Sequence, residues 1–283
     1  MAQLLSLERC DVSYGPVRAL TGVSLDLQPG EIVGVVGALG AGKTTLMRAL
    51  AGLVQPSHGS VRLDGEDITR LPWDARARLG IVHVPAGGGL FPTLTVAENL
   101  MLAEAPQSNG ERRVRLEHMF PLLVERRRQT AGSLSGGEQR QLAVARGALS
   151  RPRVLLLDEP LLGLSPVTGA TVMRLLTQLG REGVAILISE ERPTDDLRAL
   201  AGRLVGLRAG HVVGAAEVMP AFPGQVAGGG DLERVEVEMV GLPLSTRDRR
   251  ALQTIAQARG IPVGRLIAEL AHRHTEENAE EWE

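Results

Sequence analysis

The sequence predicts an α/β fold with a mostly parallel central sheet, preceded by an antiparallel β region. Three apolar runs have the length of strands but lack alternation, which is typical of strands buried on both faces: Ile32–Val36, Val154–Leu157 and Val184–Ile188. A helical pattern near Val167–Leu179 separates the last two runs. This order of strand, helix and strand is the repeating unit of α/β proteins.

The composition is that of a folded protein with no disulfide framework. The chain has 283 residues, enough for one large domain or a large domain and a small one. Hydrophobic residues make up 43% and charged residues 23%, which excludes an intrinsically disordered chain. The net charge is -2, so no overall basic field attracts nucleic acid or anionic lipid. Cys10 is the only cysteine, as expected in a reducing cytoplasm.

The sequence contains no recognisable membrane or export segment. The first nine residues lack the basic start and long apolar run of a secretory signal. No stretch approaches the roughly 20 apolar residues of a spanning helix. We therefore expect a cytoplasmic protein whose contact with a membrane is made through a partner.

The first third of the chain predicts short strands around one helix. Residues 7–12 and 23–27 alternate between apolar and polar positions, with turn sequences after each of them. The buried strand Ile32–Val36 leads into a glycine-rich turn and a helix over Thr44–Gly52. Val61–Leu63 is another short strand, followed by an Asp-Gly turn.

The middle of the chain predicts mostly helices. Residues 93–129 are rich in arginine and glutamate and follow a helical pattern. A helix over Ser135–Leu149 ends before Pro152, because the residue that precedes a proline avoids the helical region.

The segment Gly37–Thr44 fits the pattern G-x-x-x-x-G-K-[ST] of a phosphate-binding loop. It follows a buried strand and precedes a helix, so backbone N–H groups and the helix dipole can face phosphate oxygens. Lys43, the only lysine of the chain, would contact the β- and γ-phosphates, and the Thr44 hydroxyl would coordinate Mg²⁺. The alternative is a glycine-rich turn with a chance lysine. The predicted nucleotide-binding residues are Gly37, Ala38, Leu39, Gly40, Ala41, Gly42, Lys43, Thr44 and Thr45.

Two carboxylates end the buried strand Val154–Leu157. Acidic groups at the end of an apolar strand are costly unless a cation or a substrate uses them. Asp158 would hold the metal through water, and Glu159 would act as general base on the attacking water. The alternative is an acidic junction between a strand and a loop.

A second anion site is predicted at Ser135–Glu138. Ser135 can cap the following helix, and Gly136 and Gly137 leave the first N–H groups of that helix open. The alternative is a plain capping box, in which Ser135 and Glu138 only satisfy each other's backbone.

These three motifs, in this order, resemble those of ABC-type ATPases over about residues 4–215. The resemblance implies a P-loop NTPase core with an N-terminal antiparallel β subdomain and a helical subdomain near residues 93–150. It implies ATP and Mg²⁺ as cofactors. It also implies a head-to-tail homodimer, or a heterodimer with a second ABC ATPase, in which one subunit's Ser135–Glu138 closes on the other's nucleotide. Tyr14 falls at the family's adenine-stacking aromatic; the alternative is a turn tyrosine.

Finer detail resembles the ATPase subunits of branched-chain amino acid importers, the LivF type. The residues that carry this likeness are Val84–Gly87, Leu90–Pro92, Thr95–Leu100, Phe120–Pro121, Glu125–Arg127 and Gly163–Pro166. The resemblance implies integral membrane permease subunits as partners, with a contact surface around Phe91–Leu100, and a solute-binding protein indirectly. It places the protein on the inner face of the cell membrane.

Two positions depart from the family pattern. Ala86 stands where the family usually has glutamine, and alanine has no side-chain oxygen to contact metal or water. Glu190 stands where the family usually has histidine near the γ-phosphate, which makes it a second catalytic candidate. A carboxylate 4 Å from phosphate is repelled by about 1–4 kcal/mol, so Glu190 points away, is protonated or is screened by a cation. Hydrolysis is then either ordinary, or slow or dependent on a partner.

The end of the chain predicts a separate small unit. Residues 221–230 are a glycine-rich linker, and residues 231–283 carry an alternating strand, Val235–Met239, and two amphipathic helices. This order resembles a ribbon–helix–helix unit, for dimerisation or regulation. Glu236 and Glu238 would repel phosphates, so no nucleic acid is expected. The alternative is a helical pair packed on its own domain.

We therefore expect residues 1–220 to be the ATP-binding domain of an importer subunit that powers uptake of amino acids, branched-chain type, through a separate permease. The alternative is a nucleotide-gated regulator with weak turnover that acts through its C-terminal unit. A further class, ABC ATPases acting on DNA or ribosomes, usually has duplicated cassettes or long coiled coils, and one short cassette argues against it.

Overall fold

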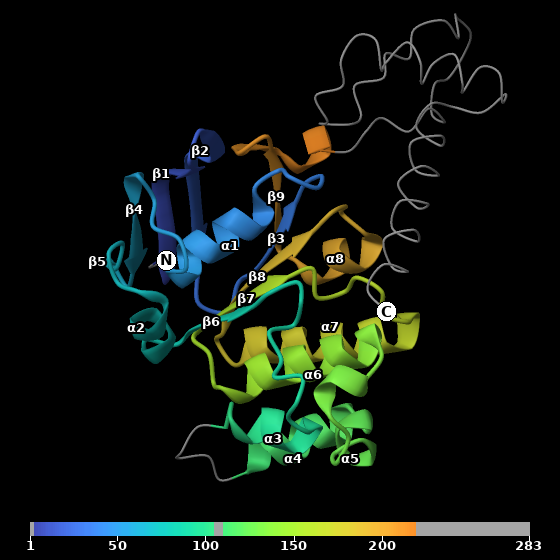
Figure 1. Cartoon of the computed structure of the whole chain (residues 1–283). Helices are drawn as coiled ribbons and strands as arrows, with labels where there is room; N and C mark the ends of the chain where they lie inside the picture. The colour runs from blue at the N-terminus through green and yellow to red at the C-terminus, as the bar shows by residue number, and fades with distance from the viewer. Residues whose placement is uncertain (1–2, 105–109, 219–283) are drawn as a thin grey trace, which may run out of the picture. The chain divides into compact units, whose positions relative to one another are not determined.

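The computed structural model describes residues 3–104 and 110–218 (Figure 1). The predicted linker and the strand–helix–helix unit of residues 231–283 lie outside the described residues. Within the described ranges, no helix is both long and apolar enough to cross a lipid bilayer.

An antiparallel sheet of four strands forms the N-terminal β subdomain, as the alternating sequence predicts. Its strand order is β2-β1-β4-β5. The strands are β1 (Leu5–Tyr14), β2 (Val17–Leu27), β4 (His58–Leu63) and β5 (Glu66–Asp67).

The second sheet has six strands in the order β10-β9-β3-β8-β7-β6. Strands β9, β3, β8, β7 and β6 pair in parallel, and only the edge strand β10 is antiparallel to its neighbour. Their bounds are β3 (Ile32–Val36), β6 (Ile81–Val84), β7 (Val154–Asp158), β8 (Ala185–Glu190), β9 (Arg203–Arg208) and β10 (His211–Gly214).

Helices cover the parallel sheet and form the helical subdomain (Figure 1). Those that connect its strands are α1 (Lys43–Ala51), α2 (Trp73–Arg78), α7 (Pro166–Arg181) and α8 (Asp195–Leu200). The helical subdomain contains α3 (Val96–Met101), α4 (Glu111–Met119), α5 (Leu122–Glu125), the 3-10 turn η1 (Ala131–Ser133) and α6 (Gly136–Leu149). A second 3-10 turn, η2 (Ala215–Val218), follows β10.

Two apolar cores lie on opposite faces of the parallel sheet. Along β7, Val154 and Leu156 pack into a core shared with α1 and the antiparallel sheet. Leu155 and Leu157 pack into a core shared with α6 and α7. Because successive side chains of a strand point to opposite faces, both faces must be apolar, which explains the unbroken hydrophobic run in the sequence.

The region 93–129 is less continuously helical than its pattern predicts. Its described residues, 93–104 and 110–129, form three short helices, and Pro121, whose ring ends the preceding helical run, lies between α4 and α5. The sequence analysis also did not predict α2, α8, β5 or the β9–β10 hairpin, all of which are short. Of these, β9 pairs with β3, which lies about 170 residues earlier in the chain.

Candidate functional site

The parallel topology brings the predicted motifs to one edge of the sheet. In register, Val36 at the end of β3 pairs with Glu190 at the end of β8, and Asp158 at the end of β7 pairs with Ser189. The carboxyl ends of parallel strands meet at the same edge, where α/β proteins bind their ligands. The Gly37–Thr44 loop, the Asp158–Glu159 pair and Glu190 therefore share this edge.

Two positions of the phosphate-binding loop require glycine, because backbone carbonyl groups of other segments lie too close for a side chain. A Cβ atom at Gly37 would lie 2.3 Å from the Leu207 carbonyl oxygen. At Gly42, φ is 107° and a Cβ atom would lie 2.6 Å from the Ala19 carbonyl oxygen. Gly42 is also the N-cap of α1, and no side chain caps this helix. The first N–H groups of α1 thus remain available to an anion.

Lys43 is buried at the start of α1, with 5% of its surface exposed. Its ammonium donates hydrogen bonds to the carbonyl oxygens of Gly37, at 2.7 Å, and Ala38, at 3.2 Å. Glu159 Oε1 lies 3.9 Å from Lys43 Nζ. A buried positive charge requires such partners, and phosphate oxygens beside the loop are chemically equivalent acceptors.

Thr44 and Asp158 form a set of oxygen ligands suited to Mg²⁺. Thr44 Oγ1 donates to Asp158 Oδ2 at 2.8 Å, and Ser189 Oγ donates to Asp158 Oδ1. A hydroxyl and a carboxylate beside the phosphate-binding loop are the hard oxygen donors that this ion prefers. The predicted pair is therefore brought together. Ser189, to which the sequence reading gave no role, orients the carboxylate; its signal was a polar residue after the apolar run of β8.

Glu159 adopts a backbone conformation that is rare for its residue type. Its φ is 52°, in the left-handed region, and its N–H donates to the Ser189 carbonyl oxygen at 3.0 Å. Non-glycine residues in this region cost on the order of 1–3 kcal/mol and cluster at functional sites. The conformation leaves the Glu159 side chain only partly buried, with its carboxylate facing Lys43.

Glu190 is buried, and its carboxylate contacts the loop that follows Glu159. Glu190 Oε1 accepts a hydrogen bond from the Leu161 N–H at 3.0 Å. Burial raises the pKa of Glu190 to about 7, with the charge of Glu159 raising it further and the Leu161 hydrogen bond, Arg140 and Lys43 opposing. At neutral pH this carboxyl group is thus divided between its protonated and ionised forms.

Ala86 contributes its backbone to the site. Arg140 Nη2, from α6, donates to the Ala86 carbonyl oxygen at 3.1 Å, and Arg140 Nη1 donates to the Leu162 carbonyl oxygen. The sequence reading assigned no role to Arg140. No sequence pattern could have found this link, because its two acceptors are backbone atoms more than 20 residues away.

Ser135 caps α6 in a complete capping box. Ser135 Oγ accepts from the Glu138 N–H at 3.4 Å, and Glu138 Oε2 accepts from the Ser135 N–H at 2.8 Å. This backbone hydrogen bond lowers the pKa of Glu138. In the described part of the chain, no hydrogen bond of Ser135, Gly136, Gly137 or Glu138 reaches the Gly37–Thr45 loop. Their binding to nucleotide stays a prediction.

Tyr14 ends β1, where it pairs with Val17 across the β1–β2 hairpin. It is 43% exposed. Its ring is thus accessible to a stacking partner, and its contact with adenine stays a prediction.

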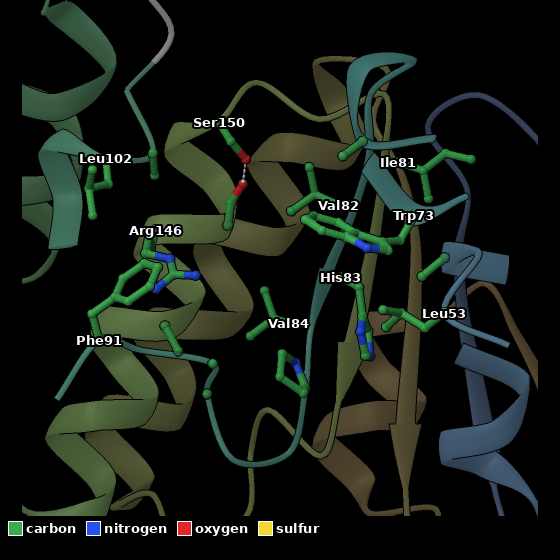
Figure 2. A pocket seen from close by; sticks show the side chains of 18 residues that line it. Leu53, Trp73, Ile81, Val82, His83, Val84, Phe91, Leu102, Arg146 and Ser150 are labelled. Carbon is green, nitrogen blue, oxygen red and sulfur yellow. Dashed lines mark hydrogen bonds between the residues drawn. The ribbon is translucent and has the colours of Figure 1, made fainter. Parts of the chain in front are cut away.

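A cavity of about 670 Å³ lies along β6, the last strand of the parallel sheet, and is also lined by residues of α2 and α6. Figure 2 shows Trp73 and His83 on one side of it and Phe91, Leu102 and Arg146 on the other. The guanidinium carbon of Arg146 lies 5.3 Å from the Phe91 ring centroid. His83 Nε2 is buried and has no hydrogen-bond partner among the described residues, and burial lowers the pKa of His83.

Comparison with known proteins agrees with this geometry. Residues 20–162 match the ABC transporter family. The high-affinity branched-chain amino acid transport ATP-binding protein BraG of Pseudomonas aeruginosa is 40% identical over 213 residues, covering 74% of this chain and 91% of that protein. The lipopolysaccharide export system ATP-binding protein LptB of Escherichia coli K12 is 34% identical, covering 71% of this chain and 85% of that protein.

Solved structures give the same result for the fold. An ATP-binding cassette in a dimeric post-hydrolysis state, bound to ADP and Pi, aligns with a TM-score of 0.66 and 27% identity, covering 74% of this chain and 96% of that one. The structure of an ATP-binding subunit of an ABC transporter aligns with a TM-score of 0.67 and 25% identity, covering 74% of this chain and 88% of that one. The chain therefore belongs to the ABC transporter family, as an ATP-binding subunit with the ATPase cassette fold.

Proposed function

We propose that this chain is the ATPase subunit of an importer that takes up amino acids, branched-chain type, through separate permease subunits. The observation that carries this proposal is the 40% identity to BraG, which extends over 91% of that protein. The LptB relatives, at 33–36% identity, are the main competing assignment.

The proposed hydrolytic site uses the residues gathered at the carboxyl edge. ATP phosphates would lie on residues 37–45, with Lys43 exchanging its loop carbonyl acceptors for phosphate oxygens. Thr44 and Asp158 would hold Mg²⁺, which supplies charge neutralisation of the phosphates when bound. Glu159 would accept the proton of the attacking water, because its carboxylate faces the loop and accepts no hydrogen bond from any residue that the structure describes. Glu190, on the neighbouring strand, would lie near the γ-phosphate.

The exposed loops support the predicted head-to-tail dimer, formed with a second copy or with another ABC ATPase. Leu39 at the tip of the phosphate-binding loop is 92% exposed, and Ser135 and Gly136 are also exposed. A Cβ atom at Gly136 would meet nothing within 4 Å, so a partner's phosphate could approach this backbone closely. Among the solved relatives, the post-hydrolysis cassette is itself dimeric.

The cavity beside Phe91 is the proposed contact with the permease. Phe91 and Trp73, which line it, are apolar side chains with about half of their surface exposed, a pattern typical of a surface that a partner covers. Its lining includes Gly88 and Gly89, which follow Ala86, so a helix seated there would touch the loop of the hydrolytic site. This contact would place the subunit on the inner face of the cell membrane, with a solute-binding protein acting indirectly through the permease.

A nucleotide-gated regulator is the second candidate function. Ala86 brings no side-chain oxygen to the site, and Glu190 places a carboxyl group near the phosphates, and both features oppose rapid turnover. In this case residues 1–220 would be the nucleotide switch, 221–230 a linker, and 231–283 the dimerisation or regulatory unit. We expect no nucleic acid as partner.

The two functions are separated by co-purification and turnover. The full chain, expressed in its native cell with a tag, should co-purify with integral membrane permease subunits, and these should raise its rate of ATP hydrolysis. Uptake of a radiolabelled branched-chain amino acid into vesicles that contain the complex should require ATP. Recovery without any membrane protein, with slow hydrolysis, would instead favour the regulator.

A further inference from the structure

Arg140 connects two loops of the hydrolytic site that are far apart in the sequence. It lies in the second turn of α6, and its two terminal nitrogens donate to the carbonyl oxygens of Ala86 and Leu162. Within the described residues, no carboxylate lies within salt-bridge distance of Arg140. Its guanidinium is therefore committed to these backbone acceptors, which suit its planar fork of donors.

The loop that receives this contact carries Glu159. Residues 159–164 connect β7 to α7, and the internal backbone hydrogen bonds of this loop are long: 3.4 Å from Leu162 N to the Glu159 oxygen and 3.3 Å from Leu164 N to the Leu161 oxygen. Hydrogen bonds of this length are weaker than ordinary backbone hydrogen bonds, in which the N···O distance is near 2.9 Å. External contacts must then supply much of what keeps the loop in place.

Ser189 holds the start of the loop by accepting from the Glu159 N–H, and two further side chains contact the residues that follow. Glu190 accepts from the Leu161 N–H at 3.0 Å, and Arg140 donates to the carbonyl of the next residue, Leu162. Arg140 is also close enough for its charge to favour the ionised form of Glu190. The strained backbone of Glu159, with φ at 52°, lies two residues before this pair of contacts. Strain of this kind persists only where surrounding contacts hold it.

The other end of the Arg140 link reaches the loop that departs from the family pattern. Ala86 has no polar side chain, but its carbonyl accepts from Arg140 at 3.1 Å. Nearby, a Cβ atom at Gly88 would lie 3.2 Å from Ala143 Cβ, so this loop also packs against α6 one turn after Arg140. Gly88 and Phe91 line the cavity proposed to receive the permease.

We infer that Arg140 is a positioning residue for hydrolysis: it ties the Ala86 loop to the 159–164 loop and so fixes Glu159 in place. Its two hydrogen bonds join these loops through backbone carbonyl oxygens, so the link does not depend on the side chain at position 86. Through this link, a change in the cavity can be passed by contacts of the Ala86 loop and Arg140 to Glu159, the general base. This inference rests on the proposed role of Glu159, and its first readout is independent of that role.

The test uses the full chain and three variants: R140A, R140K and R140Q. The control is R174A, which removes an exposed arginine of α7 whose described hydrogen bond stays within its own helix. Amide hydrogen exchange of residues 159–165 should become about tenfold faster in R140A, while exchange in β3 and β7 stays unchanged. R140K should behave similarly, because one ammonium cannot hold two carbonyls in a fixed fork. R140Q keeps donors for one carbonyl and should lie between R140A and the parent.

The second readout compares the effect of each substitution on kcat with its effect on nucleotide affinity. In R140A, kcat for ATP should fall about tenfold or more, while nucleotide affinity stays within about twofold, because the phosphate-binding loop is untouched. R174A should match the parent in both readouts. If R140A does not fold, R140K and R140Q provide the same comparison with a side chain of similar length.

The outcomes separate this inference from the proposed function. Unchanged exchange over 159–165 in every Arg140 variant overturns the tie, whatever happens to turnover. Faster exchange with unchanged kcat shows that the tie exists but does not position Glu159, and so overturns the inference as well. If the parent protein itself has no turnover that depends on Glu159, the proposed role of the base fails, while the exchange result still decides whether Arg140 holds the loop.

Discussion

Thr44 Oγ1 donates a 2.8 Å hydrogen bond to Asp158 Oδ2, joining two residues that are 114 positions apart in the chain. Thr44 belongs to the first turn of α1 and Asp158 ends β7, so this single contact connects the phosphate-binding loop to the acidic strand. A magnesium ion at this place would draw on both residues, and the hydrogen bond shows that they already lie within ligand distance of a common point.

Lys43→Ala should abolish nucleotide binding. The substitution removes the only lysine of the chain and leaves Glu159 without the positive charge 3.9 Å from its carboxylate. Affinity for a fluorescent ATP analogue should fall by about two orders of magnitude or more, from the loss of a charge-assisted contact with phosphate. R174A is the matched control for removal of a positive charge. Unchanged affinity in the Lys43 variant would contradict the assignment of the phosphate-binding loop.

Glu159→Gln should bind ATP but fail to hydrolyse it. The amide keeps the shape of the side chain and cannot accept a proton from water, so turnover should fall by about 10²–10⁴-fold. In a chain ending at residue 220, the variant should accumulate as an ATP-bound dimer in sedimentation velocity, whereas the same chain with Glu159 returns to a monomer as ATP is consumed. Hydrolysis at the parent rate would mean that another group is the base.

Ala86→Gln should raise turnover if the missing side-chain amide is what weakens the site. Arg140 holds this residue through the backbone carbonyl, so the substitution leaves that contact in place. The rate of ATP hydrolysis at saturating ATP measures the effect, and Ala86→Leu controls for side-chain size. No gain, or a loss in both variants, would indicate that the Gly87–Gly89 loop or a partner already fills this role.

Glu190→Gln should make the protein more stable at neutral pH than the parent. Burial raises the pKa of Glu190 from 4.5 to about 7 in the folded state. At pH values between these two pKa values, the folded protein binds more protons than the unfolded chain. The free energy of unfolding of the parent therefore decreases as pH rises from one pKa to the other. The full difference between the pKa values in the folded and unfolded states corresponds to about 3 kcal/mol in the free energy of unfolding.

The measurement is urea unfolding of both proteins from pH 4.5 to 8. The two free energies of unfolding should be similar at the acid end and separate as pH rises, since the glutamine variant lacks the titrating group. Glu159, Arg140 and Lys43 are the charged groups that face Glu190, so the salt concentration should be held constant. If the free energies of unfolding of the two proteins change in parallel across this pH range, the pKa of Glu190 is not raised by folding.

The C-terminal unit should dimerise without binding DNA. Without nucleotide, the full chain should sediment as a dimer, and a chain ending at residue 220 as a monomer. A unit as small as residues 231–283 buries little core alone and usually needs a partner. The full chain should not retard duplex DNA at low salt. A monomeric full chain would remove the ribbon–helix–helix interpretation, and salt-sensitive DNA binding would support the regulator.

The sequence predicted the parts of the site that are defined by local pattern, and not those defined by distant contacts. The Gly37–Thr44 loop, the end of β7 and the Ser135 cap each follow from residues adjacent in the chain. Arg140 could not be found, because its acceptors are backbone carbonyls of two other loops. Arg76 is a similar case: it is fully buried and donates to the carbonyls of Ala49 and Leu50 at the end of α1. Nothing in its neighbouring sequence predicts burial of a charge.

The two cores on either side of β7 also constrain how this protein can change over evolution. A single-residue insertion or deletion in the strand would exchange the residues that face the two cores, and would move Glu159 into the position of Asp158 or the reverse. Replacing one apolar residue of the strand by another does not change which positions face which core, so such substitutions should be tolerated. We therefore expect related sequences to vary freely in which aliphatic residue occupies each position, and never in the length of the strand.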